Sequence, residues 1–488
     1  MHALLLVAVT TAGCKGRQTT DDTAALWQET CARCHTRKEL AGRTADEIQT
    51  ALKEIPPMRA LRVRLKPVQI QALARLLAGK ETASAGLPPY RYQLSDMCRP
   101  CHPNQVAQWS GSMHARAHEE VVYERYFIKA SQETGQKIET FCARCHTPLG
   151  VRFGEIPFHS APRGPGGTRV SKVATEGVQC DFCHTISGYD ALKNGGYRLT
   201  AVRVMRGPLR GARSPFHGTE FSPLHRQAEL CGTCHDVSHP DCGVELETTY
   251  SEWRASPYAR QGVVCQDCHM TRGLTHRLAQ PGRAGHGGPP REHISDHGFI
   301  GPNILFATND SEPVRRLKRL SLQLMQQAAR LYIETPRRET VGLVLPIRVS
   351  NVGAGHGLPT GVTELRQMWL EVTVTDGGGR TVLRSGGLDA KGDLLPGTIL
   401  YHTDVFDREG KVTTRFWNTV RKGRDHRIPP LQSVVEQVVV PGAPRGPLKV
   451  EVLLRYRSVS PAGLAEVNAP RDLVPIPVIT MTRATATL

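Results

Sequence analysis

The sequence has 488 residues, of which 39% are hydrophobic and 6% aromatic, and its formal net charge is +17. This length has room for two to four domains, but the low apolar and aromatic content argues against one large core built from protein alone. Beyond the first dozen residues no apolar run approaches the about 20 residues that span a bilayer, which excludes a polytopic membrane protein.

Residues 1–19 resemble a bacterial lipoprotein signal and tether. An apolar run over residues 3–9 leads into a Thr-Ala-Gly-Cys sequence that ends at Cys14, and this run is too short for a transmembrane helix. The run lacks a preceding Lys or Arg, and Thr11 stands where Leu is usual, so the pattern is imperfect. We expect a lipid on Cys14, and Lys15 after it is typical of outer-membrane retention. The alternative is a plain thiol in a cleaved peptide.

Cysteine and histidine share one repeated pattern, because twelve of the 14 cysteines fall into six Cys-x-x-Cys-His motifs. Two thioether sulfurs at this spacing reach the two vinyl groups of one haem, and the next residue presents an imidazole to the iron. A disulfide framework does not require His after every second Cys, zinc fingers need a recurring downstream His pair, and a thioredoxin-like site has one such motif. The sequence therefore predicts six covalently bound haem c groups, attached at Cys31, Cys34, Cys98, Cys101, Cys142, Cys145, Cys180, Cys183, Cys231, Cys234, Cys265 and Cys268, with iron ligands His35, His102, His146, His184, His235 and His269.

Residues 20–86 resemble a small class I cytochrome c. A motif at Cys31 is followed by a loop containing Met58 and by an apolar helical stretch over 68–77. The resemblance implies an all-α monohaem domain in which Met58 is the second iron ligand, and His/Met ligation raises the reduction potential relative to two histidines. A core methionine that fills a gap is the alternative. Residues 80–90 have the composition of a linker.

Residues 87–311 hold the other five motifs, with about 34 residues of chain per motif between Cys98 and His269. So little chain cannot surround each cofactor with its own protein core, so we expect the haems to pack against one another. The prediction is a haem-dense pentahaem core that is mainly α-helical or irregular, with short haem-bearing helices and loops. Packed haems in a row are the geometry of an electron conduit.

Eight segments between residues 98 and 270 carry a family resemblance: 98–103, 109–114, 176–184, 207–208, 214–217, 229–231, 249–258 and 266–270. Through them the sequence over about 95–300 resembles the multihaem cytochromes related to the tetrahaem cytochrome of ammonia oxidation. The resemblance implies covalent haem and electron transfer, and in that family one haem lacks a strong distal ligand. A sixth motif on a separate front domain departs from the tetrahaem pattern, so the physiological role does not simply transfer.

Residues 312–336 are predicted to form a linking helix. Ser311 is a candidate N-cap, and Pro336 ends the pattern. Apolar residues recur every three or four positions at Leu317, Leu320, Leu324, Ala328 and Leu331. Residues 337–488 change to alternating apolar runs separated by Gly and Pro, which predicts a C-terminal β-sandwich. We interpret it as a packing or docking module.

The distal iron ligands are less certain from sequence, because fourteen histidines remain for at most five positions if Met58 serves the first haem. Sequence context favours His114, His217, His297 and His356. The last lies in a Gly-rich loop between two strands, as in related multihaem proteins, although a surface histidine is the alternative. His118 could ligate or lie beside a haem edge. His159, His225, His239 and His402 are reserves, and His276, His286 and His293 are expected in solvent.

The charge and the cofactors together bear on partners and location. Six haems carry propionates worth roughly −12, which leaves the holoprotein near about +5, so the basic composition does not indicate nucleic-acid binding. Haem attachment in bacteria requires export, so we expect the periplasm or the outer membrane and cell surface. The favoured function is electron transfer between redox proteins, without catalysis. A homo-oligomer or filament, an enzyme acting on a small nitrogen or sulfur species at one open haem, and a structural surface module stay open, as does the role of Cys242.

Overall fold

The computed structural model describes residues 40, 43–54, 70, 73–74, 77, 92–155, 170–200, 204–273, 279–442, 446–469 and 474–488. The chain divides into two compact units. Residues 1–89 with 152–154 form the first unit, and residues 90–151 with 155–488 form the second. Cys14, Cys31, Cys34, His35 and Met58 lie outside the described residues, so the lipid site and the first haem site remain predictions.

Helix α2 (Ala45–Glu54) belongs to the first unit and starts with a reciprocal cap. The Thr44 hydroxyl accepts from the Glu47 backbone N–H at 3.2 Å, and the Glu47 carboxylate accepts from the Thr44 N–H at 2.7 Å. Leu52 on this helix is buried, as are Leu73 and Leu77.

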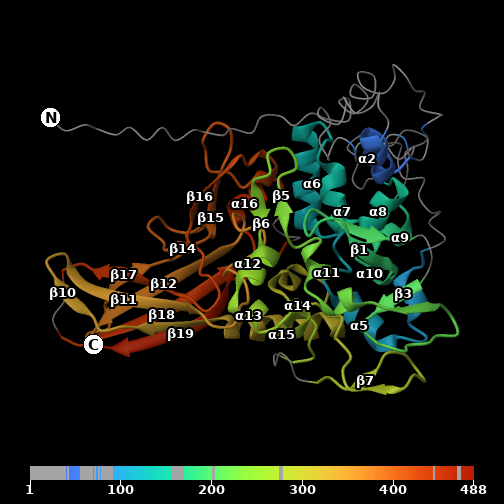
Figure 1. The fold of residues 1–488 in the computed structure, drawn as a ribbon. Coiled ribbons are helices and arrows are strands. Elements are labelled where there is room, and N and C mark those ends of the chain that lie inside the picture. Colours follow the sequence, from blue (N-terminus) through green and yellow to red (C-terminus); the bar gives the residue numbers. More distant parts are fainter. Residues whose placement is uncertain are drawn as a thin grey trace. The chain divides into compact units, whose positions relative to one another are not determined.

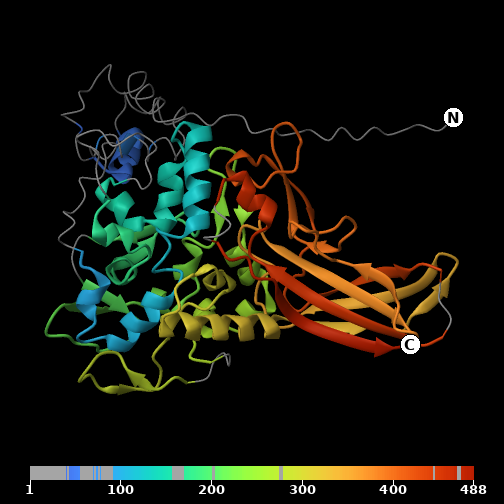
Figure 2. The same ribbon diagram turned by 180° about the vertical axis from the view of Figure 1, so that it is seen from behind.

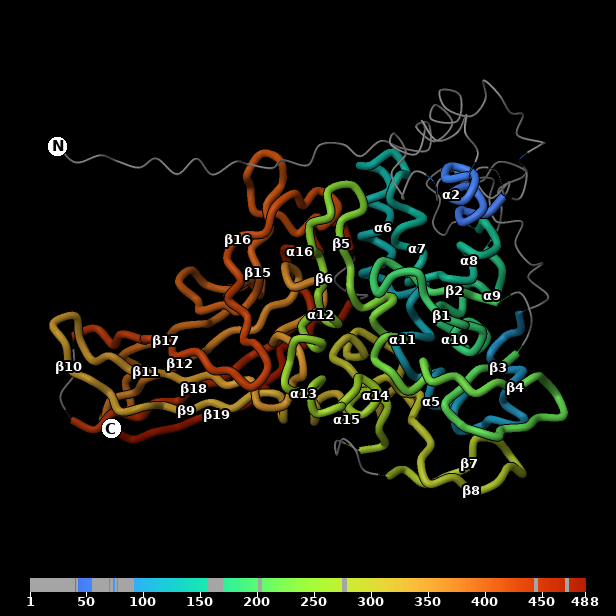
Figure 3. Tube along the Cα trace, viewed as in Figure 1, coloured from blue at the N-terminus to red at the C-terminus, as the bar shows by residue number. Residues whose placement is uncertain are grey.

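Short elements joined by loops make up residues 92–311, which we call the motif region and which belong to the second unit apart from residues 152–154 (Figures 1 and 3). Its helices are η3 (Ser95–Cys98), α5 (Pro103–Gly111), α6 (Val121–Thr134), α7 (Glu139–His146), α8 (Pro148–Phe153), α9 (Lys172–Thr175), α10 (Cys180–Thr185), η4 (Pro223–Arg226), α11 (Glu229–Gly232), α12 (Thr249–Ala255), α13 (Pro257–Arg260), α14 (Cys265–His269) and η5 (Pro302–Phe306). The described helices of the chain include none with the length and apolarity of a membrane span.

The motif region also contains two-stranded ribbons, which the sequence patterns did not predict. Strand β3 runs parallel to β4, and the other pairs are antiparallel. The strands are β1 (Ile186–Tyr189) with β2 (Tyr197–Leu199), β3 (Val204–Gly207) with β4 (Gly218–Phe221), β5 (Val237–Ser238) with β6 (Glu245–Glu247), and β7 (Gly282–Arg283) with β8 (Pro290–Arg291).

Two larger sheets follow in residues 329–488, which we call the sandwich (Figures 1 and 2). In the first, β10, β11 and β17 are neighbours and β9 also pairs with β11; in the second the order is β13-β12-β18-β19, and β14 also pairs with β12. The strands are β9 (Ala329–Ile333), β10 (Arg337–Glu339), β11 (Gly342–Asn351), β12 (Gln367–Asp376), β13 (Thr381–Ser385), β14 (Leu400–Tyr401), β17 (Ser433–Val440), β18 (Leu448–Arg457) and β19 (Ile479–Thr487), with a separate pair β15 (Thr403–Phe406) and β16 (Arg421–Asp425), and short helices η6 (Phe416–Asn418) and α16 (Pro461–Glu466).

Alternate residues of the two sheets face a shared interior. Leu345 and Ile347 of β11 and Leu370 and Val372 of β12 belong to one buried cluster, which also contains Val450 of β18. This is the core that the alternating pattern of residues 337–488 predicted, because successive strand residues point to opposite faces.

The linking helix is shorter than predicted. Helix α15 (Glu312–Ala328) starts after Ser311, whose side chain makes no capping hydrogen bond, and ends eight residues before Pro336. Ala329 begins strand β9, in which Leu331 pairs with Val349 of β11. The ladder with β11 satisfies the backbone groups that a longer helix would have used, so tertiary pairing overrides the helical spacing of the leucines.

The sandwich is packed directly onto the motif region. Tyr126 and Ala130 of α6 share a buried cluster with Trp417 and Leu464. The indole of Trp417 donates to the Glu133 carboxylate at 2.9 Å, and the Tyr126 hydroxyl donates to the Gly463 carbonyl at 3.1 Å. Helix α15 adds contacts to α5 in the motif region and to β19 in the sandwich. Residues on the sandwich loops are thereby held in place against the motif region.

Candidate haem sites

Five of the six motifs lie among the described residues, and each includes a short helical segment. Helices α7, α10 and α14 end at or next to the motif histidine, and α11 and η3 carry the first cysteine of theirs. Residues at i, i+3 and i+4 share one helix face, so both sulfurs and the imidazole turn to the same side. The described cysteines are free thiols, and they stand in for the thioether sulfurs of an attached haem.

The five described motif histidines each have an acceptor at Nδ1. In four of them the acceptor is a backbone carbonyl, so Nδ1 carries the proton and Nε2 is the nitrogen available to a metal. The fifth, His235, faces the Glu247 carboxylate instead. The Nδ1 distances are 2.6 Å from His102 to Ala284 O, 3.1 Å from His146 to Ala117 O, 2.6 Å from His184 to Arg206 O, 2.7 Å from His269 to Ile300 O, and 3.4 Å from His235 to Glu247 Oε1.

Four motif histidines each face a second histidine, and the distance between the two ring centroids is nearly the same in all four pairs. Metal–imidazole bonds of about 2.0–2.1 Å put the ring centroids of two imidazoles on opposite sides of one ion about 6 to 6.5 Å apart. The second histidines are the four that sequence context favoured. The centroid distances are 6.3 Å for His102 and His217, 6.3 Å for His235 and His114, 6.4 Å for His184 and His297, and 6.4 Å for His269 and His356.

The second histidines are oriented by local contacts. Nδ1 of His217, His297 and His356 lies 3.0, 3.1 and 2.9 Å from the carbonyl oxygens of Gly218, Ser295 and Gly357. Nδ1 of His114 is buried and has no hydrogen-bond partner within the described part of the chain.

The loop that carries His356 comes from the sandwich, between β11 and β12. Asn351 at the end of β11 donates to the His356 carbonyl at 2.9 Å, and the backbone N–H of Gly357 donates to the Glu252 carboxylate at 2.8 Å. Glu252 also pairs with Arg427 at 2.5 Å. The loop is thus tied to α12 of the motif region, which brings His356 to His269.

The reserve histidines are engaged elsewhere. The ring of His225 lies 5.7 Å from that of His184, but its Nε2 lies 3.1 Å from the Cys183 carbonyl and donates to it. Nε2 of His239 donates to the Trp417 carbonyl, and Nε2 of His402 faces Asp404. His286 and His293 are exposed, as expected, whereas His159 and His276 lie outside the described residues. The Cys242 thiol lies 3.6 Å from the Thr419 carbonyl.

His146 differs from the other motif histidines. Its ring stacks on Tyr123, with centroids 3.8 Å apart and planes 3° apart. Among the described histidines none lies at a metal-bridging separation from it. Nearby, Nδ1 of the buried His118 lies 2.9 Å from the Thr147 hydroxyl. The sequence pattern gave no indication of Tyr123.

Burial controls the charge of these imidazoles. It lowers the pKa of His114 to about 3 and the pKa values of His146, His269 and His297 to about 4, so all four are neutral at pH 7 and able to bind a metal. Burial acts in the same direction on His235, but the hydrogen bond and negative charge of Glu247 raise its pKa to about 9.

Cysteines of different motifs lie close to one another. Cys98 is a neighbour of Cys180, Cys145 of Cys234, Cys231 of Cys265, and Cys183 of Cys234, in each case near enough to influence the pKa of the partner thiol. The motif that ends at His235 therefore neighbours three others. Phe299, at φ 47°, lies between His114 and His297, with centroid distances of 4.3 and 6.1 Å.

One cavity of about 2250 Å³ connects the five described motifs and is lined by their cysteines and histidines. A site for one small molecule is usually about 300–1,000 Å³, so this cavity has room for several large groups. Together with the paired neutral imidazoles and the adjacent sulfurs, it fits covalently attached haem. Haem c bound there would supply an iron that cycles between Fe(II) and Fe(III).

Comparison with known proteins agrees with this geometry. Residues 97–185 match the family described as cytochrome c554 and c-prime. The structure is similar to the crystal structure of a penta-heme cytochrome c552 from Thermochromatium tepidum, with a TM-score of 0.55, 18% sequence identity, and coverage of 82% of this chain and 99% of that chain. The fold is that of a multihaem c-type cytochrome. A search of curated proteins finds none that matches this multihaem cytochrome chain.

Proposed function

We propose that the chain is a hexahaem c-type cytochrome that transfers electrons between redox proteins without catalysis. The single cavity lined by all five described motifs carries this proposal, because haems attached to these motifs would share one space. The chain itself would hold the cofactors through the motif cysteines and would fix the imidazole tautomers through Nδ1. The sixth haem rests on Cys31, Cys34, His35 and Met58.

Two measurements test this function: the number of haems per chain, and the rate at which the reduced protein passes electrons to a redox protein. We expect pyridine haemochrome quantitation and intact mass to give six haems per chain. In stopped-flow measurements, the reduced protein should return every haem to the ferric state when mixed with an oxidised soluble c-type cytochrome. Fewer haems than six would contradict the cofactor count, and a set of haems that exchange electrons only with a small substrate would contradict the carrier function.

The location forms part of the same proposal. Covalent haem attachment requires export in bacteria, and the apolar run before Cys14 supports a lipid anchor at the outer membrane or cell surface. Radiolabelled fatty acid should be incorporated into the wild-type chain and lost in Cys14→Ser. Incorporation into both chains would place the lipid elsewhere.

A second candidate function rests on His146. Because no described histidine lies across from its ring, the haem at Cys142 and Cys145 is a candidate for a five-coordinate iron that binds a small nitrogen or sulfur species. A high-spin ferric signal that shifts when nitric oxide or nitrite is added would favour this oxidoreductase. A purely low-spin spectrum would leave the carrier function alone.

A further inference from the structure

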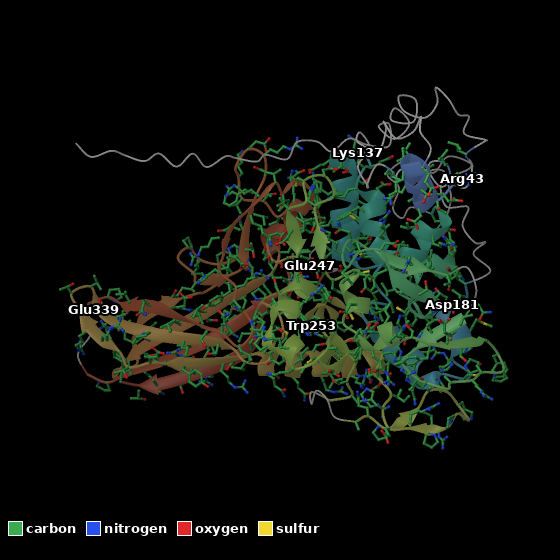
Figure 4. All side chains as sticks on the ribbon, viewed as in Figure 1. Arg43, Lys137, Asp181, Glu247, Trp253 and Glu339 are labelled. Carbon is green, nitrogen blue, oxygen red and sulfur yellow. The ribbon has the colours of Figure 1, made fainter. Side chains whose placement is uncertain are left out.

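We propose that Glu247 is a positioning residue that holds the reduction potential of the haem attached at Cys231 and Cys234 below those of the haems at the other four described motifs. The inference rests on the proposed electron-transfer function and adds a built-in low-potential branch point to it. Glu247 lies near the junction of the motif region and the sandwich (Figure 4).

Local structure brings the carboxylate to the imidazole. The ribbon of β5 and β6 begins two residues after His235, and Val237 on β5 pairs with Glu247 on β6. The return strand thereby places Glu247 Oε1 3.4 Å from His235 Nδ1. The other four described motif histidines face backbone carbonyls at this position, so His235 alone among them has a charged acceptor.

The environment keeps this charge effective. The Glu247 side chain is 16% exposed, the Thr249 hydroxyl donates to the same Oε1 at 3.1 Å, and the positive charge of Arg366 stabilises the carboxylate. The His235 side chain is 53% exposed and lines the cavity, so an attached haem would cover it, and interactions between charges are stronger where water is excluded. A carboxylate at Nδ1 makes an imidazole a stronger donor to its metal, and this stabilises Fe(III) relative to Fe(II).

The motif of Cys231 and Cys234 lies between other motifs, so a lowered reduction potential of its haem would affect electron transfer among them. Its cysteines lie close to Cys145 and Cys265 of two other motifs, and Cys183 of a third motif is also close. If this haem has a low reduction potential, it is reduced only briefly while an electron passes between its neighbours. Electrons would therefore reside on the haems of the neighbouring motifs.

A hydrogen-bond chain extends from Glu247 to the sandwich. The Thr249 hydroxyl, whose proton goes to Glu247, accepts from the Thr360 hydroxyl at 2.8 Å. The Gly357 backbone N–H in the same sandwich loop donates to Glu252, which is paired with Arg427. Thr249 therefore links the Glu247 carboxylate to the loop of the sandwich.

The direct test is a haem-resolved redox titration of Glu247→Gln, followed by EPR. We expect at least a tenfold change in the reduction equilibrium of one haem, toward easier reduction, which equals about 59 mV for one electron. One low-spin EPR signal should shift with it. Glu245→Gln is the matched control, because Glu245 lies on the same strand, is 61% exposed and pairs with Lys422; it should change neither.

A second variant keeps the test decisive if Glu247→Gln does not load haem. Thr249→Val removes one donor from the carboxylate and leaves its charge, so the same haem should become harder to reduce. Unchanged potentials in Glu247→Gln would overturn the role of Glu247, as would unchanged potentials in Thr249→Val where Glu247→Gln does not load haem, or equal shifts in Glu245→Gln. Failure of the carrier function would appear separately, as wild-type protein that does not reduce a redox protein.

Discussion

Tyr123 lies face to face with the imidazole of His146, at a centroid distance of 3.8 Å. Tyr123 is held by the start of α6, where the Glu120 carboxylate accepts from the backbone N–H groups of Val122 and Tyr123 at 2.9 and 2.8 Å. The plane of the imidazole is thus set by a capped helix, although its metal-facing nitrogen has no histidine opposite it among the described residues.

Tyr123→Leu should change the EPR signal of one haem and leave the others unaltered. Leucine removes the flat surface that fixes the His146 ring, so the imidazole gains rotational freedom about its bond to the iron. Tyr123→Phe keeps the stack and serves as the control, with a spectrum close to wild type. Equal spectra for all three proteins would show that the stack does not orient the ligand.

His356→Ala should convert one low-spin haem to a high-spin form, measured by the ferric absorption and EPR spectra. The reason is the 6.4 Å separation from His269, which corresponds to two imidazoles on one metal. His402→Ala is the control from the same sandwich, because Nε2 of His402 faces Asp404 at 3.2 Å. A low-spin spectrum in His356→Ala would assign the distal position of this haem to another residue.

His297 and His225 both lie near His184, and paired substitutions distinguish them. We expect His297→Ala to produce one high-spin haem and His225→Ala to keep every haem low-spin, because Nε2 of His225 donates to the Cys183 carbonyl at 3.1 Å. The opposite result would mean that the His225 ring turns over when haem is attached.

Glu364 gives a pH dependence of stability. Both carboxylate oxygens are buried without a hydrogen-bond partner among the described residues, and burial raises the pKa of this group to about 7, although Arg366 and Lys422 oppose the rise and Glu247 adds to it. The folded chain binds a proton that the unfolded chain has released, so stability falls as pH rises from about 4.5 to about 7.

Glu364→Gln should remove this dependence and stabilise the protein above pH 7 by on the order of 3 kcal/mol. Urea unfolding of the holoprotein at several pH values, followed by circular dichroism, measures the effect. Glu339→Gln is a matched control, because Glu339 is 46% exposed at the far end of the sandwich (Figure 4). A parallel pH profile in Glu364→Gln and wild type would contradict the assignment.

Features that depend on a local rule, such as the haem-attachment motifs, could be predicted from the sequence. The motif spacing follows from the covalent reach of one haem, so the attachment cysteines can be named without knowing the fold. His114, His217, His297 and His356 were favoured by their flanking residues, and the structure places each opposite a motif histidine. Whether they bind iron is what the spectra above measure.

The end of helix α15 and the position of Glu247 could not be predicted from the sequence, because both depend on pairing between strands. Around residue 330 two patterns overlap: Leu324, Ala328 and Leu331 fit a helix, whereas Ala329, Leu331 and Ile333 fit a strand. Residues 329–333 form a strand because they pair with β11 through backbone hydrogen bonds. Glu247 is similar, since nothing local marks it until the β5–β6 ribbon turns it back to His235.

The origin of His356 in the sandwich has a consequence for biogenesis. All six motifs precede residue 270, so a chain made from its N-terminus exposes every attachment cysteine before the loop of His356 has been synthesised. His356 reaches its place opposite His269 only once the sandwich has folded onto the motif region. A chain truncated before the sandwich would therefore keep every motif and still lack the histidine opposite His269.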